Sequence, residues 1–128
     1  MSAKIRIAII GAGGFGREVY HLLNDDLYEC IGFIDNAVES KNLPVPILGH
    51  ERNMENLIAK FEFSQCIIAL GDIEKRKKIV NQIKQFQLKF PLVNDSTSVN
   101  YSHDIGDGTI LYPGVVIMND GKIGQFIL

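Results

Sequence analysis

The stretch from residue 4 to residue 16, Lys-Ile-Arg-Ile-Ala-Ile-Ile-Gly-Ala-Gly-Gly-Phe-Gly, decides the fold of the first part of this chain. It begins as a β-rich run and becomes wholly apolar, as a central parallel strand does. The run breaks at Gly11-x-Gly13-x-x-Gly16, and a helical pattern with Val19 on its apolar face follows. A buried strand, a glycine loop and a helix are therefore predicted in direct succession.

Each glycine of this loop has its own predicted role. Gly11 permits a tight turn, Gly13 lets a phosphate approach the backbone, and Gly16 allows close packing of helix and sheet. Free N–H groups at the helix start, together with the helix dipole, attract a phosphate. The alternative is a glycine-rich turn that serves packing only. On the first interpretation, Gly13→Val blocks phosphate binding. The residues of the predicted loop are Gly11, Ala12, Gly13, Gly14, Phe15 and Gly16.

Strands and helices alternate up to residue 92. After the first strand, further strands are predicted at residues 29–34, 47–48 and 65–70, and helices from the glycine loop to residue 24, at 52–60 and at 73–86. Such alternation argues for right-handed βαβ units and a parallel sheet. The predicted fold class is α/β, with a small Rossmann-like, doubly wound domain over residues 1–92.

Two further loops fall at the carboxyl ends of predicted strands, where open parallel sheets bind ligands. Asp35-Asn36 follows the second strand, and the Asp35 carboxylate there can accept from a sugar hydroxyl or a base N–H. The other loop is Gly71-Asp72, where Gly71 leaves room for a ligand. Asp72 is placed to cap the next helix, and this role alone accounts for an aspartate at this position. A contact between Asp72 and a ligand stays open as the alternative. Asp35, Asn36, Gly71 and Asp72 join the glycine loop as candidate site residues.

An aliphatic residue recurs every six positions in the last third of the chain. A period of six fits neither a strand nor a helix, but it is typical of the hexapeptide repeats of a β-helix. The alternative is a run of irregular strands with chance spacing. Residues 93–128 make two coils at three strands per coil, and repeat arrays need about three units, so the β-helix is expected to be incomplete. Either the 128 residues are part of a longer enzyme, or the protein has lost its catalytic half. The recurring residues are Val93, Val99, Ile105, Leu111, Ile117 and Ile123.

Composition excludes several classes of protein. Hydrophobic residues make up 46% of the 128 residues and the net charge is −2, so a core is possible and nucleic-acid binding is disfavoured. The one basic run, residues 75–78, is interpreted as the solvated face of a helix. No apolar stretch approaches twenty residues, so no membrane span is predicted. Cys30 and Cys66 lack a CxxC pair and are interpreted as buried residues of a protein in a reducing cytosol, without a metal site.

These motifs together resemble those of one family. The order Gly-Ala-Gly-Gly-Phe-Gly, then Phe-Ile-Asp-Asn at residues 33–36, then Ala-Leu-Gly-Asp-Ile-Glu-Lys-Arg at 69–76, then hexads is similar to the bacterial sugar O-/N-acyltransferases. These are related to the sialic acid O-acetyltransferases and to the bacillosamine- and perosamine-pathway N-acetyltransferases. The stretch at residues 112–124 is especially like the family's early hexads.

The resemblance implies a nucleotide-sugar-binding domain joined to a left-handed β-helix. Family members are trimers that bind acetyl-CoA between neighbouring β-helices, without a metal, and act in cytoplasmic steps of surface-glycan synthesis. By motif, residues 11–16, 35–36 and 71–72 would hold the nucleotide part of a sugar donor, expected to be a UDP-sugar. Arg76 matches a family Arg whose role is either structural or in ligand binding.

Departures from the family pattern are equally informative. Phe15 stands where the family often has His, and Val93-Asn-Asp95 replaces a His-Pro dipeptide. The family's catalytic His, a general base, lies in a coil beyond residue 128. His103-Asp104 imitates that motif one coil too early, so His103 is interpreted as a turn residue, with catalysis as the alternative. The 128 residues alone are expected not to acetylate a sugar.

A second class of function stays open. The chain can be a non-catalytic module that binds NAD or a free nucleotide, with the hexads serving assembly. Four predicted strands amount to hardly more than one mononucleotide-binding half, which argues against NAD. His50 follows Gly49 in a loop and has no partner visible in the sequence.

Overall fold

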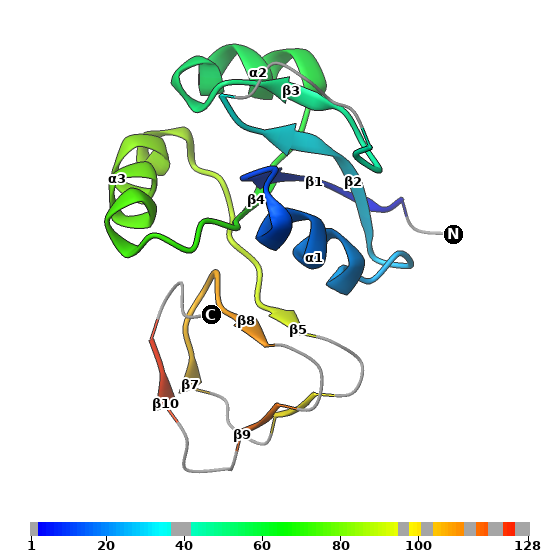
Figure 1. Cartoon of the computed structure of the whole chain (residues 1–128), viewed down its shortest axis with the longest axis vertical. Coiled ribbons are helices and arrows are strands. Elements are labelled where there is room, and N and C mark those ends of the chain that lie inside the picture. Colours follow the sequence, from blue (N-terminus) through cyan, green and yellow to red (C-terminus); the bar gives the residue numbers. More distant parts are fainter. Residues whose placement is uncertain are drawn as a thin grey trace.

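Four parallel strands form the sheet around which the first part of the chain is arranged (Figure 1). The structure is a computed structural model, and it describes residues 3–36, 42–94, 98–100, 104–111, 115–117 and 122–124. The elements of this part are β1 Ile5–Ile10, α1 Gly14–Leu22, β2 Tyr28–Ile34, β3 Ile47–Gly49, η1 Glu51–Asn53, α2 Met54–Phe61, β4 Gln65–Ile68, α3 Ile73–Ile83 and η2 Lys84–Phe86.

The strand order is β3-β2-β1-β4. Strand β1 lies in the centre, and its Ile9 pairs with Phe33 of β2 on one side and with Ile67 of β4 on the other. Ile7 to Ile10 are buried, as the apolar run predicts. The order reverses between β1 and β4, which makes this the topological switch point of the sheet. The predicted Rossmann-like parallel sheet is confirmed.

The two faces of the sheet are covered by different helices. Ala8 and Ile10 belong to one hydrophobic cluster with Met54 of α2 and with Ile79 and Ile83 of α3. The alternate residues of β1 point the other way, because successive side chains of a strand face opposite sides. They form a second cluster with α1, whose buried members are Ile7, Ile9, Val19, Leu23, Phe33, Ile67, Ala69, Val93 and Ile110.

Six strands of two residues each follow the sheet, and they pair in parallel as β5 with β8, β6 with β9, and β7 with β10. Their bounds are β5 Val93–Asn94, β6 Val99–Asn100, β7 Asp104–Ile105, β8 Ile110–Leu111, β9 Val116–Ile117 and β10 Lys122–Ile123. Each of the six recurring aliphatic residues lies in one of these strands. Val93 pairs with Ile110, and Ile105 pairs with Ile123, so partners are 17 or 18 positions apart.

Strands β5 and β8 pack against the α1 face of the sheet. Val93 and Ile110 are buried in the α1-face cluster, together with residues of β1, β2 and β4. The backbone N–H of Val93 donates to the carbonyl of Thr109 at 2.9 Å, and the buried Thr109 hydroxyl donates to the carbonyl of Gly124, also at 2.9 Å. Side chains from both sides of residue 92 therefore contribute to one core.

The two cysteines lie where the sequence predicts them, in strands β2 and β4. Burial raises the pKa of the Cys30 thiol to about 11 and raises the pKa of the fully buried Cys66 thiol as well. Within the described residues no group of three His, Cys, Asp or Glu side chains is placed to hold a metal ion. Across the same ranges, none of the helices is long and apolar enough to cross a membrane.

Candidate functional site

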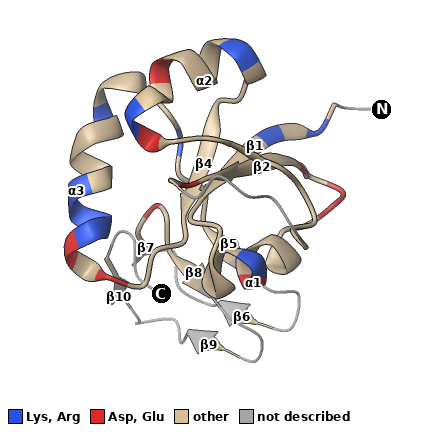
Figure 2. Ribbon diagram, turned by 45° about the horizontal axis from the view of Figure 1, so that its top comes forward, with Lys and Arg blue, Asp and Glu red and all other residues tan. Residues whose placement is uncertain are grey.

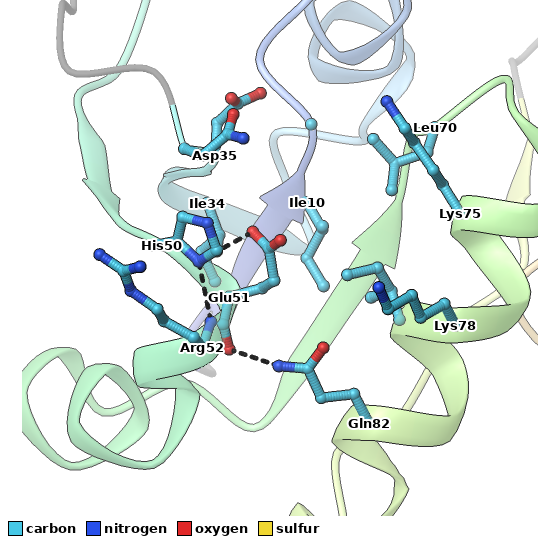
Figure 3. Close-up of a pocket in the computed structure, with 13 residues that line it drawn as sticks. Ile10, Ile34, Asp35, His50, Glu51, Arg52, Leu70, Lys75, Lys78 and Gln82 are labelled. Carbon is cyan, nitrogen blue, oxygen red and sulfur yellow. Dashed lines mark hydrogen bonds and ion pairs between the residues drawn. The ribbon is translucent and has the colours of Figure 1, made fainter.

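A pocket of about 540 Å³ opens at the switch point of the sheet (Figure 3). Its floor is aliphatic and comes from Ile10 at the end of β1, Ile34 at the end of β2, Leu70 after β4 and Ile79 of α3. The volume lies in the range of small-molecule pockets, and eight polar or charged side chains surround the aliphatic floor. The remaining lining residues are Gly11, Asp35, Asn36, His50, Glu51, Arg52, Lys75, Lys78 and Gln82.

One wall of the pocket carries carboxylates and other polar groups. Asp35 and Asn36 follow β2, while His50 directly precedes η1 and Glu51 is its first residue. The His50 Nδ1 atom accepts from the backbone N–H of Arg52 at 3.1 Å, so it caps η1. The Glu51 carboxylate, 3.5 Å from Nδ1, forms an ion pair only with protonated His50.

The opposite wall is the first half of α3, and it is basic. Lys75 and Lys78 line the pocket from positions three residues apart, which places them on the same side of the helix. Figure 2 shows Lys and Arg residues along this stretch of α3. The sequence-based interpretation of residues 75–78 as a solvated helix face is thus incomplete. These lysines are exposed, but two of them also face the pocket.

The two walls are joined at the base of the pocket. The Gln82 side-chain amide donates to the backbone carbonyl of Glu51 at 3.5 Å, a contact between α3 and η1 (Figure 3). His50, Glu51, Lys75, Lys78 and Gln82 were not predicted as site residues. They come from segments far apart in the sequence, and only the folded chain brings them together.

The glycine loop is shaped by backbone approach at two positions. Gly11 has φ +109°, and a Cβ there would lie 2.6 Å from the carbonyl oxygen of Ala69. A Cβ at Gly16 would overlap the carbonyl oxygen of Gly11. The predicted roles of these two glycines, a tight turn and close packing of helix and sheet, are confirmed. At Gly13 a Cβ would meet nothing within 4 Å.

Asp35 fixes the position of the glycine loop. Its Oδ2 atom accepts from the backbone N–H of Ala12 at 2.7 Å, which joins the end of β2 to the end of β1. The carboxylate is half-buried, so part of its interaction with water is replaced by this bond. The side chain therefore has a structural role in addition to any contact with a ligand.

We predict that Asp35→Ala lowers the free energy of unfolding, because the loop loses a hydrogen bond to a charged acceptor. Such bonds contribute about 1.5–3 kcal/mol, and partial exposure places the expected loss near the lower value. Asp35→Asn keeps an oxygen that can accept from Ala12 and should cost less. Urea denaturation of both variants measures the difference. Equal stability of Asp35→Ala and the wild type would contradict the structural role.

The other predicted site residues lie outside the pocket lining. Gly13 and Gly14 are exposed at the start of α1, Phe15 packs against the α1-face cluster, and Gly71 is exposed. Asp72 caps α3 as predicted, because its Oδ1 atom accepts from the N–H groups of Glu74 at 2.9 Å and Lys75 at 3.1 Å.

Arg76 does not line the pocket either, although it is half-buried on α3. His103, the candidate catalytic residue, lies outside the described residues. The same holds for residues 125–128 at the end of the chain.

Comparison with known proteins decides the family. The family model for the PglD N-terminal domain matches residues 6–83, which is more than half of the chain. The chain belongs to the PglD N-terminal domain family. The matched residues contain the sheet from Arg6 onward and the whole of α1, α2 and α3, but not η2, and they include every residue of the pocket. The family resemblance inferred from the sequence is thereby confirmed.

Relatives of this PglD-type chain include sugar acetyltransferases. GDP-perosamine N-acetyltransferase of Escherichia coli O157:H7 is 27% identical over 127 residues, covering 92% of this chain and 56% of the relative.

Solved structures share the fold of the PglD-type chain. A mutant perosamine N-acetyltransferase from Caulobacter crescentus, in complex with CoA and GDP-perosamine, aligns with a TM-score of 0.81 at 23% identity, covering 97% of this chain and 59% of that one. The acetyltransferase domain of PglB from Neisseria gonorrhoeae FA1090, in complex with acetyl coenzyme A, aligns with a TM-score of 0.67 at 21% identity, covering 97% and 66%. The chain thus spans less than two thirds of each of these three proteins.

Proposed function

We propose that this chain is the nucleotide-sugar-binding part of an acetyl-CoA-dependent sugar acetyltransferase in bacterial surface-glycan synthesis. The observation that carries the proposal is the pocket at the switch point between β1 and β4. It lies in a PglD N-terminal domain, and Gly11, Asp35 and Asn36 are among the residues that line it. Open α/β sheets bind nucleotides at this place. The parent reaction joins an acetyl group from acetyl-CoA to an amine or hydroxyl of the sugar and releases the CoA thiol.

The chemistry of the pocket supports a nucleotide as its ligand. The aliphatic floor suits the faces of a base and a ribose, the carboxylates of Asp35 and Glu51 suit their N–H and O–H donors, and Lys75 and Lys78 suit phosphate. The two relatives described above as perosamine N-acetyltransferases act on or contain GDP-perosamine. We therefore propose a GDP-sugar as a second candidate ligand of the pocket, beside the UDP-sugar expected from the sequence.

We further propose that residues 93–128 are the first coils of a left-handed β-helix, and that the full protein is a trimer which binds acetyl-CoA between β-helices. Two observations support the β-helix: the recurring aliphatic residues lie in short strands, and paired strands are about three hexads apart. The CoA and acetyl coenzyme A in two solved relatives support the cofactor. A catalytic His is not assigned to the described residues.

The competing function is a module that binds NAD or a free nucleotide. A sheet of order β3-β2-β1-β4 is one mononucleotide-binding half with a single added strand, whereas a dinucleotide extends across two halves. This strand count favours a ligand with one nucleoside.

We predict that a nucleoside diphosphate sugar binds this chain more tightly than NAD does. Isothermal titration calorimetry with UDP-N-acetylglucosamine, GDP-mannose and NAD at one salt concentration measures the order of affinities. We expect one of the two sugar nucleotides to bind, with a Kd at least tenfold below that of NAD, equivalent to about 1.4 kcal/mol. Tighter binding of NAD would favour the competing function.

A further inference from the structure

The cap of η1 is made by a histidine, a residue whose hydrogen bonding depends on pH. The Nδ1 atom of His50 accepts from the backbone N–H of Arg52 at 3.1 Å, and η1 begins directly after this ring. The usual caps are serine, threonine, aspartate and asparagine, whose oxygens accept throughout the physiological pH range. A protonated imidazole donates from both nitrogens and accepts from neither. Since histidine changes its charge between about pH 5 and pH 8, a cap of this kind depends on pH within that range.

A second partner for the protonated ring lies beside it. The Oε2 atom of Glu51 is 3.5 Å from the same Nδ1 atom, and the side chains of His50 and Glu51 are only 26% and 22% exposed. Partial burial reduces the screening of an ion pair by solvent. The Nδ1 atom therefore has two alternative partners, the Arg52 N–H when the ring is neutral and the Glu51 carboxylate when the ring is protonated (Figure 3).

The register of β3 directs His50 toward the pocket. The pairing of β2 with β3 shifts by one position, so that Leu48 is an extra residue in β3. Bulges of this kind re-aim the side chains near them and are frequent beside functional sites. The N–H of Asp35 then donates to the carbonyl of Gly49 at 2.9 Å, which fixes the residue before His50 at the carboxyl end of the sheet. The ring is thus held in the pocket lining by the backbone of the sheet itself.

We propose that His50 is a pH-sensitive positioning residue of the pocket wall. The neutral ring caps η1 and so holds Glu51 and Arg52 in the pocket lining. The protonated ring turns to the Glu51 carboxylate and releases the Arg52 N–H, and the bond from the Gln82 amide to the Glu51 carbonyl loses its fixed acceptor. The wall is therefore ordered at neutral pH and loosened toward about pH 5. This regulation rests on the proposed function, because it concerns the same pocket.

Other charged groups face the same pocket from three elements. Asp35 follows β2, Arg52 belongs to η1, and Lys75 and Lys78 project from α3 (Figure 3). Histidine is the one among these residue types that ordinarily titrates between about pH 5 and pH 8. Protonation of His50 also adds a positive charge to the lining, which attracts an anionic ligand whatever the state of η1. An uncharged ligand is therefore the appropriate probe of the wall.

The state of the wall can be followed without a ligand. In NMR spectra recorded between about pH 7.5 and pH 5.5, we expect the Arg52 amide proton to move upfield along the titration curve of the His50 ring, because this N–H loses its acceptor. Asparagine accepts at a cap position but does not titrate, so in H50N the Arg52 signal should stay in place. In H50A the signal should have the upfield position at both pH values. H21N removes an exposed histidine outside the pocket lining and should behave as the wild type.

The consequence for the pocket is measured with uridine and guanosine, which lack a phosphate that itself titrates near about pH 6. The nucleoside that binds the wild type should bind about threefold to tenfold more weakly at about pH 5.5 than at about pH 7.5, the effect of one lost hydrogen bond. In H50N the affinity should be the same at both pH values.

Two results would overturn the inference: an Arg52 signal that does not follow the His50 ring, or a nucleoside affinity with the same pH dependence in H50N as in the wild type. Failure of the proposed function has a different signature. In that case neither nucleosides nor sugar nucleotides bind at any pH, while the Arg52 signal still reports on the cap.

Discussion

Gly16→Ala is expected to destabilise this protein by more than about 3 kcal/mol, although it adds a single methyl group. Overpacking of a core usually costs about 1–3 kcal/mol, because neighbouring side chains can shift. Here the added Cβ would overlap the carbonyl oxygen of Gly11, which is backbone of the central loop. Helix α1 would have to move away from the sheet and give up packing of Val19 and Phe33. Urea denaturation followed by circular dichroism measures the loss.

Gly14→Ala is the matched control in the same helix. Its Cβ would meet only the end of the Arg17 side chain, at 3.8 Å. Alanine is a better helix former than glycine by up to about 1 kcal/mol, so this variant should be as stable as the wild type or more stable. If Gly16→Ala were within about 1 kcal/mol of Gly14→Ala, the close approach of helix and loop could not be as the structure has it.

Ile110→Ala is expected to destabilise the sheet, although residue 110 lies well beyond the part matched by the PglD family model. Ile110 is 2% exposed and belongs to the α1-face cluster with Ile9 and Phe33. Truncation of a buried isoleucine to alanine costs about 2–5 kcal/mol, through lost transfer energy and the cavity that remains. The expected result is a lower midpoint for unfolding of the whole sheet, measured as the loss of helical ellipticity.

Ile73→Ala removes the same atoms from an exposed position. Ile73 is 57% exposed at the start of α3, so its truncation should change stability by less than about 0.5 kcal/mol. An unfolding midpoint of Ile110→Ala equal to that of Ile73→Ala would show that the strands after residue 92 do not support the sheet.

The fold was largely predictable because its signals are local. The apolar run of β1, the glycines that follow and the cap at Asp72 each lie within a few residues of the structure they determine. Boundaries were less exact. The helix predicted at residues 52–60 is α2 Met54–Phe61, preceded by the 3-10 turn η1, because His50 caps that turn through its ring nitrogen. Sequence patterns give no indication of such a cap.

The site was predictable only in part. Asp35 and Asn36 line the pocket as expected, since the end of a parallel strand is a position that the sequence reveals. Lys75 and Lys78 were interpreted as part of a solvated run, because a series of four basic residues does not show which of them faces a neighbour. That depends on how α3 packs against the sheet through Ile79 and Ile83. His50 gained its partner from the backbone of Arg52.

The central position of β1 has a consequence for synthesis of the chain. This strand leaves the ribosome before the other strands of the sheet, yet it lies between two of them, and β4, which covers one of its edges, begins at Gln65. Until then Ile7 to Ile10 present an apolar strand with an open edge, the kind of surface to which other nascent chains add. Strand β2 covers the other edge earlier. While residues 34 to 65 are synthesised, one edge of β1 is therefore still uncovered, and in this interval a chaperone would protect the chain from aggregation.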